Sequence, residues 1–219
     1  MSNKHMLYRA HKRYITIEAS NHDAIPDELK EQGFNHIGDI DYKDGILYGG
    51  LETSDKRSAL ARWNATDLTW MSSRLVDQRG GAPWIAVDKT QGLLYSAGWS
   101  EADAINVYDL DTFDPVGRVP AAAGTRVPAE VQGGAFWSED PNGLYLATNG
   151  GCSVYRFDVV TGESEFILSD DYDKRRHEYE MEGLTFWDLG EGVDGGQMHM
   201  FGNFMEVKEK SIHSYRHKR

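Results

Sequence analysis

The feature that most constrains the fold of this chain is a repeat with a period of roughly 50 residues. Each copy holds two short apolar or aromatic runs, joined by a turn rich in Gly, Asp or Asn. The second run carries an anchor residue, and the four anchors, which are 47, 50 and 54 positions apart, are Tyr48, Tyr95, Tyr145 and His199. Two such runs around a short turn predict a β-hairpin, so we expect four hairpins along the chain.

Each copy continues with two further strand-like runs. In the second copy these are residues 105–109 and 115–119, with a turn at residues 111–114 between them. Four strands per copy at this period are typical of the blades of a β-propeller. We therefore predict an all-β fold, a four-bladed β-propeller that forms one domain over residues 1–219, with blades at about residues 36–77, 82–120, 129–169 and 180–219.

The fourth copy lacks a run for its outer strand. Residues 13–19 form a strand-like run near the N-terminus, and we predict that they complete this blade and close the ring, which removes an open sheet edge. A five-bladed propeller is the alternative, although only residues 20–35 remain for it, and these indicate a loop with a short helix. An open β-sandwich is a further alternative, but a sandwich has no reason to repeat an anchor at near-constant spacing.

The charge balance of the chain disfavours some classes of binding partner. With 23 Lys and Arg against 35 Asp and Glu, the formal net charge is −12. Nucleic-acid backbones and anionic membrane surfaces are bound by clustered cations, so we expect neither partner. The polar residues 1–14 show no signal peptide, and a single cysteine, Cys152, fits a reducing compartment, so we expect a cytoplasmic protein. A processed secreted chain stays open, as does the origin of residues 1–5, because His5-Met6 resembles a cloning junction.

Polar and aromatic residues occupy the strand ends that should meet at the mouth of the propeller. The first strand of each blade begins at that mouth and the second strand ends there, so these positions should converge near the axis. The first-strand positions are His36, Pro83, Gln132 and Glu182, and the second-strand positions are Glu52, Trp99, Asn149 and Asn203. A ring built only to pack would repeat small apolar residues here, so the pattern predicts a site for a small organic molecule.

Side-chain chemistry suggests a role for each candidate. His36 and Asp39 can move a proton, and with Arg126 they form the predicted catalytic group. Arginine holds a carboxylate or phosphate with two hydrogen bonds, and tryptophan stacks on a ring. On these grounds four residues are predicted to bind substrate: Arg79, Trp84, Trp99 and Gln132. The alternatives are packing for the tryptophans and solvated loops for the arginines, as we expect for Arg175 and Arg176 in an acidic loop.

The first predicted strand concentrates a histidine and two aspartates. On a regular strand, Asp39 and Asp41 share one face and His36 points to the other, so a compact triad requires a bulge. Asp41 has an equivalent in the second copy, Asp88, and an aspartate that recurs before a turn is expected to cap that turn. Asp39 has no acidic equivalent, which makes it a candidate for function.

Residues 182–188, Glu-Gly-Leu-Thr-Phe-Trp-Asp, resemble the Glu-Gly-Pro-x-Trp stretch of the gluconolactonase and strictosidine-synthase-like propellers, and residues 132–137 are a variant of it. Those families have six blades, and the proline of their stretch is absent here. The resemblance implies that Glu182 is a ligand for a divalent metal on the propeller axis, with Asn149 and Asn203 in the place of the family's amide ligands.

Carboxylate and amide oxygens suit a hard cation, so with Glu52 as a fourth ligand the expected metal is Ca²⁺ or Mg²⁺. A metal in this place could polarise a carbonyl or acidify a water molecule. The function hypothesis is therefore an enzyme, either a metal-assisted hydrolase of lactone or ester type or an isomerase or lyase. The alternatives are a structural Glu182 and a non-catalytic binding propeller with a structural cation. The residues specify no substrate, reaction or oligomeric state.

Overall fold

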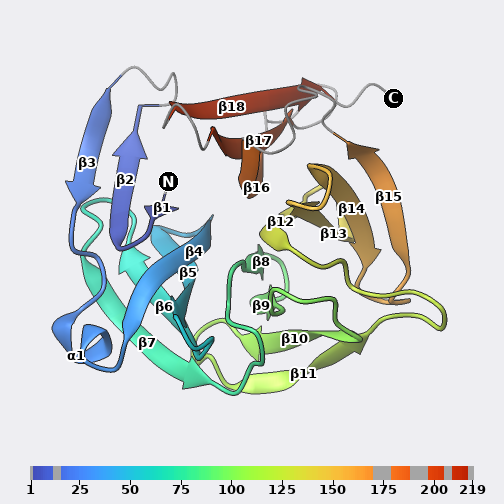
Figure 1. Ribbon diagram of the computed structural model, residues 1–219, viewed down its shortest axis with the longest axis horizontal. Helices are drawn as coiled ribbons and strands as arrows, with labels where there is room; N and C mark the ends of the chain where they lie inside the picture. Colours follow the sequence, from blue (N-terminus) through green and yellow to red (C-terminus); the bar gives the residue numbers. More distant parts are fainter. Residues whose placement is uncertain (1, 12–15, 170–178, 188–196, 205–208, 217–219) are drawn as a thin grey trace. The chain divides into compact units, whose positions relative to one another are not determined.

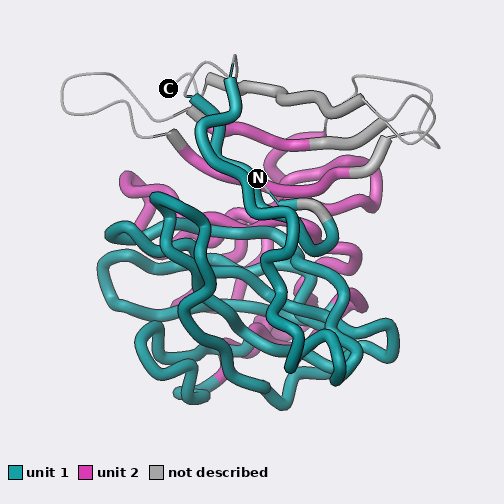
Figure 2. Tube along the Cα trace, turned by 90° about the vertical axis from the view of Figure 1, so that its left-hand side faces the viewer, with its two compact units in different colours: residues 1–98, 106–117 teal, residues 99–105, 118–219 magenta. Residues whose placement is uncertain are grey.

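The computed structural model of the protein describes residues 2–11, 16–169, 179–187, 197–204 and 209–216, and nearly all of its regular structure is strand (Figure 1). The chain divides into two compact units (Figure 2): unit 1 holds residues 1–98 and 106–117, and unit 2 holds residues 99–105 and 118–219. In the part of the chain listed above, no helix has the length and apolar character needed to cross a membrane.

Unit 1 opens with a three-stranded antiparallel sheet made of β1 (Ser2–Asn3), β2 (Met6–Ala10) and β3 (Ile17–Asn21). A short helix, α1 (Asp27–Lys30), precedes a four-stranded sheet of β4 (Phe34–Lys43), β5 (Ile46–Thr53), β6 (Ser58–Asn64) and β7 (Trp70–Val76). The next sheet contains β8 (Ala86–Asp88), β9 (Leu93–Ser96), β10 (Ala104–Asp109) and β11 (Pro115–Pro120), and its last two strands each belong partly to both units.

Unit 2 contains two further antiparallel sheets. The first has four strands, β12 (Val131–Trp137), β13 (Asp140–Thr148), β14 (Ser153–Asp158) and β15 (Ser164–Ser169). The second has three described strands, β16 (Tyr179–Trp187), β17 (Gln197–Phe204) and β18 (Glu209–Arg216).

Consecutive strands are neighbours in every one of these sheets, which is the meander expected of a propeller blade. The predicted all-β fold is therefore confirmed. Three predicted copies, residues 36–77, 82–120 and 129–169, coincide with the sheets β4–β7, β8–β11 and β12–β15. The number of blades, four with five as the alternative, stays a prediction, and so does the single domain.

The N-terminal segment forms a sheet of its own within unit 1. Residues 17–21 form β3, which pairs with β2 (Leu7 opposite Asn21), and the role of this segment as the outer strand of the last blade stays a prediction. Residues 12–15 of that predicted strand lie outside the described residues. Lys4 adopts the left-handed backbone conformation (φ 48°) and turns β1 back onto β2. Only one side chain of β2, that of Leu7, is buried, and this strand was not predicted from the sequence.

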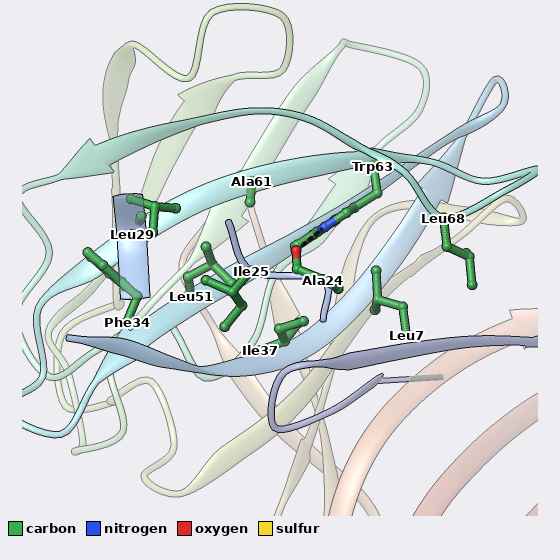
Figure 3. Close-up of a cluster of buried hydrophobic side chains, with 11 residues drawn as sticks. Leu7, Ala24, Ile25, Leu29, Phe34, Ile37, Leu51, Ala61, Trp63 and Leu68 are labelled. Carbon is green, nitrogen blue, oxygen red and sulfur yellow. Dashed lines mark hydrogen bonds between the residues drawn. The ribbon is translucent and has the colours of Figure 1, made fainter. Parts of the chain in front are cut away.

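A hydrophobic cluster fixes the segment before α1 to the first four-stranded sheet (Figure 3). Trp63 of β6 is fully buried, and its Nε1–H donates a hydrogen bond to the carbonyl oxygen of Ala24 at 2.8 Å. Ile25, Ile37 and Leu51 are buried in the same cluster. Each fully buried side chain of this size contributes about 1.5–3 kcal/mol, so this cluster is a major source of stability for unit 1.

Three aspartates at the ends of strands cap the turns that follow them, whereas Asp41 does not. Asp88, Asp109 and Asp158 each accept hydrogen bonds from the backbone N–H groups two and three residues further along, at 2.8–3.0 Å. Asp41 instead accepts the N–H of Val87 at 2.9 Å, in addition to that of its neighbour Tyr42. Burial raises the pKa of Asp41, although Lys89 and these two N–H groups oppose the rise. Asp41 therefore links β4 to β8 instead of capping its own turn.

Deleting residues 1–5 should destabilise unit 1. The N–H of Ile37 donates to the carbonyl of Lys4 (2.5 Å) and the N–H of Ala24 donates to that of His5 (2.8 Å), and both donor residues are buried. Each unsatisfied buried N–H costs about 1–3 kcal/mol, so with two of them urea denaturation should show a loss of about 2–6 kcal/mol. His5→Ala keeps the carbonyl and should match the full chain. A truncated chain with the midpoint of the full chain would contradict this expectation.

Candidate active site

The structure brings two of the predicted residues together as cross-strand neighbours. His36 near the start of β4 lies opposite Glu52 near the end of β5, because the two strands run antiparallel from the hairpin turn at Asp44-Gly45. His36 Nδ1 is 3.3 Å from Glu52 Oε2. Lys56, in the turn between β5 and β6, places Nζ 3.6 Å from the same oxygen.

The three side chains differ sharply in exposure. The Glu52 side chain is 6% exposed, whereas that of His36 is 40% exposed and that of Lys56 is 49% exposed. A buried carboxylate is costly unless positive charge or hydrogen bonds compensate it, and His36 and Lys56 provide both at Oε2. The carboxylate is thus held inside while its two basic partners reach the solvent.

The other oxygen of Glu52 has a different environment. Oε1 is buried and has no hydrogen-bond partner among the residues that the structure describes. Gly81, in the connection between β7 and β8, lies directly against it, and a Cβ atom at this position would collide with Oε1. Gly81 also has φ +84°, a conformation that favours glycine. The backbone of this connection therefore covers one side of the carboxylate.

A histidine paired with a buried carboxylate is suited to proton transfer. In the neutral ring, the contact with Glu52 Oε2 requires the proton on Nδ1, which leaves Nε2 as an acceptor. Because the ring is partly exposed, Nε2 can meet a molecule from solvent. The carboxylate then stabilises the imidazolium that forms when Nε2 takes up a proton.

The other candidates in unit 1 have varied surroundings. Asp39 is partly buried; its Oδ1 accepts the N–H of Ile40 at 2.9 Å, and β4 bulges between Ile37 and Ile40. The regular alternation expected for this strand is therefore interrupted at Asp39. Arg79 is exposed two residues before Gly81. Trp84 is 0% exposed, and its role as a substrate contact stays a prediction.

Gln132 and Glu182 occupy equivalent bulges in unit 2. In β12 the pairing shifts between Val131 and Gly133, and in β16 it shifts between Met181 and Gly183, so each polar residue is the extra one. A Cβ atom at Gly133 would collide with the backbone of Leu184, so this glycine lets β12 and β16 approach closely. The repeated Gln-Gly and Glu-Gly pairs thus have a structural cause that the sequence analysis did not identify.

The contacts and exposure of the remaining candidates in unit 2 differ from one residue to the next. Asn149 Oδ1 accepts the N–H of Met181 at 2.6 Å and so ties the end of β13 to β16. Glu182 is exposed, and Asn203 lies on β17, with its side chain outside the described residues. The carbonyl of Trp99 accepts the N–H of Glu130 at 2.7 Å. Arg126 is exposed, whereas Arg175 and Arg176 fall outside the described residues.

The predicted metal ligands Glu52, Glu182, Asn149 and Asn203 are divided between the two units, so their joint site stays a prediction. Within the described ranges, no group of three or more His, Cys, Asp or Glu residues is arranged to hold a metal ion. In unit 1, the group around Glu52 is a carboxylate with two bases.

Unit 2 contains a second ionised cluster, which the sequence analysis missed. Asp140 accepts hydrogen bonds from Arg156 Nε (2.6 Å) and Nη2 (2.9 Å), and Tyr145 Oη donates to the same carboxylate at 3.1 Å. The guanidinium lowers the pKa of Asp140, while burial and the adjacent carboxylate raise the pKa of Tyr145 to about 12. Arg156 also forms an ion pair with Asp158 (3.2 Å), so both partners of its guanidinium belong to the same sheet. We therefore interpret the cluster as structural.

Comparison with known proteins shows the fold alone. No protein-family model matches the chain, and no curated protein matches it significantly. Glutaminyl cyclase from Myxococcus xanthus is similar in structure with a TM-score of 0.60 and 15% identity, over 83% of this chain and 74% of that one.

Two further solved structures are similar in the same way. Luciferin-regenerating enzyme matches with a TM-score of 0.58 and 12% identity, over 90% of this chain and 64% of that one. A chain of the nidogen/laminin complex matches with a TM-score of 0.54 and 13% identity, over 96% of this chain and 78% of that one. This chain thus spans less than two thirds of the luciferin-regenerating enzyme. All three are propeller-like, and this protein is a β-propeller.

Asp140→Asn should weaken the protein most at neutral pH. Because the folded pKa of Asp140 is lowered, its stabilising effect is fully present above the unfolded pKa and disappears as the pH falls through the folded value. Hydrogen bonds to this partly buried charge should make the loss about 1–2 kcal/mol at pH 7, measured by urea denaturation. The loss should shrink below about pH 4. Asp114→Asn, which breaks an exposed pair with Arg74, should cost about 0–1 kcal/mol. An equal loss at every pH would contradict the assignment.

Proposed function

We propose that this β-propeller is an enzyme that acts on a small organic molecule by acid–base chemistry at the His36–Glu52 pair. The observation that carries the proposal is the 3.3 Å contact between a partly exposed histidine and a buried carboxylate. Such a pair prepares the outer nitrogen of the ring to accept a proton. The two similar enzymes and the nidogen/laminin chain support only the fold, which serves both catalytic and binding proteins.

His36 Nε2 is the proposed base. In hydrolysis of a lactone or ester it would take a proton from water as the water attacks the carbonyl carbon, and it would return the proton to the departing alkoxide oxygen. In an isomerisation it would remove a proton from a carbon next to a carbonyl and return it at the new position. In both reactions Glu52 accepts the Nδ1–H bond throughout and stabilises the charged ring.

The substrate is proposed to carry an anionic group. Arg79 is exposed two residues from Gly81, which touches Glu52, and Lys56 lies beside the same carboxylate. Two cations near one base suit a carboxylate or a phosphate. Arg126, Trp99 and Gln132 of unit 2 stay proposed contacts to the same substrate, and Asp39 a proposed second proton carrier.

His36→Gln tests the proposal directly. The purified protein would be assayed for hydrolysis of a panel of small lactones and esters, with and without a carboxylate, and for proton exchange next to their carbonyls. Loss of a positioned base should lower turnover about 10²–10⁴-fold. His22→Gln is the matched control, because this exposed histidine contacts Tyr8 away from Glu52. Absence of any turnover in the unmodified protein, or equal turnover in both variants, would refute the proposal.

A divalent cation, Ca²⁺ or Mg²⁺, held by Glu182, Asn149, Asn203 and Glu52, is the second candidate. The buried Oε1 of Glu52, which has no hydrogen-bond partner among the described residues, favours it. Two contacts count against it: the Asn149 oxygen already accepts the N–H of Met181, and the ammonium group of Lys56 lies beside Glu52. When bound, such a cation would polarise a carbonyl oxygen of the substrate.

Elemental mass spectrometry of untagged protein tests the cation. If it is present, about one equivalent of metal should be found, and Glu182→Gln should lower both the metal content and the melting temperature. Glu165→Gln, an exposed residue on β15, is the control. Protein that stays empty after incubation with Ca²⁺, Mg²⁺, Mn²⁺ and Zn²⁺ would rule out this second candidate and leave the histidine mechanism standing.

A further inference from the structure

The connection between β7 and β8 contains a turn, residues 78–81, that covers the buried carboxylate of Glu52. Gly80 and Gly81 both have left-handed backbone conformations, with φ of 83° and 84°. This shape brings Gly81 directly against Glu52 Oε1, so closely that a side chain there would collide with the oxygen. The oxygen therefore faces a Cα–H group, which is at best a weak partner.

Gln78 fixes this turn from the interior of unit 1. Its amide is buried, and Nε2 donates to the carbonyl of Gly81 (2.7 Å) and to Ser96 Oγ (2.9 Å). Its Oε1 accepts hydrogen bonds from Asn106 Nδ2 and Tyr108 Oη, both at 3.1 Å. Both donors and both acceptor sites of the amide are thus used, which leaves Gln78 no alternative orientation.

The two ends of the Glu52 carboxylate consequently have different roles. Oε1 is closed off by the backbone of Gly81, whereas Oε2 contacts both His36 and Lys56. We infer that residues 78–81 form a clamp, held by Gln78, that directs Oε2 to His36, so that Glu52 is a positioning residue that orients the base and does not touch the substrate. The inference rests on the proposed function for its meaning in catalysis, but the clamp itself can be tested without a substrate.

A pair of glycine variants separates the clamp from general strain. Gly81→Ala places a methyl group on Oε1 and should push the carboxylate away from His36. Gly92→Ala is the matched control, because Gly92 also has a left-handed φ (+68°) in the same unit, outside the β4–β5 hairpin that holds His36 and Glu52, with nothing within 4 Å of its missing Cβ. Both variants carry the penalty of a side chain at a left-handed position, and only the first places an atom on Glu52.

The measurement is the ¹⁵N NMR spectrum of the neutral His36 ring, which reports which nitrogen holds the proton. The full chain and Gly92→Ala should show the proton on Nδ1. Gly81→Ala should shift the signals toward the tautomer mixture of a histidine in an unfolded peptide. Unchanged signals in Gly81→Ala, or equal changes in both variants, would overturn the inference.

A second pair covers the case in which Gly81→Ala does not fold. Gln78→Met keeps the volume of the side chain but releases Gly81, whereas Tyr108→Phe removes the hydrogen bond that Tyr108 Oη donates to Gln78 Oε1, on the side of the amide away from Gly81. The clamp requires the His36 signals to change in Gln78→Met and to persist in Tyr108→Phe. If neither changes them while His36→Gln abolishes turnover, the clamp is wrong and the proposed function stands. If the signals change as expected but no variant affects turnover, the proposed function is wrong and the clamp stands.

Discussion

The packing of the first strands of the sheets depends on glycines that let two backbone segments approach more closely than a side chain would allow. Gly133 of β12 lies against Leu184 of β16, and Gly38 of β4 lies against the carbonyl of Pro83. At both places the strand also bulges, which leaves an extra residue outside the regular pairing. Close packing thus places polar residues beside the glycines, and the candidate residues Asp39, Gln132 and Glu182 all occupy such positions.

The strand pattern was predictable because it depends on local chemistry. Alternating apolar residues and the Asp-Gly turn at residues 44–45 are enough to define the β4–β5 hairpin, which brings the start of β4, with His36, beside the end of β5, with Glu52. Both residues were predicted from the sequence to be functional, but with different roles, His36 as a proton carrier and Glu52 as a metal ligand. Their direct contact depends on register, which a bulge shifts by one residue and which no local pattern reports.

The remaining differences come from long-range packing. The full burial of Trp84 could not be predicted, because the exposure of an aromatic ring depends on what packs over it. Strands β1 and β2 were missed because β2 buries only Leu7, whose packing partners lie elsewhere in unit 1. Asp140 and Arg156 are 16 positions apart and become a bidentate pair only through the β13–β14 pairing. Charge pairs of this kind leave no periodic trace in a sequence.

The hydrogen bond from the N–H of Val87 to Asp41 makes the first copy of the repeat different from the second. Its equivalent in the second copy, Asp88, acts within its own turn, whereas Asp41 accepts the N–H of Val87 in the following sheet. The second copy placed in the first position would bring an aspartate already bonded within its own turn, and the N–H of Val87 would lose its acceptor. The copies are therefore similar in form but no longer exchangeable, and their order along the chain is itself part of what the sequence encodes.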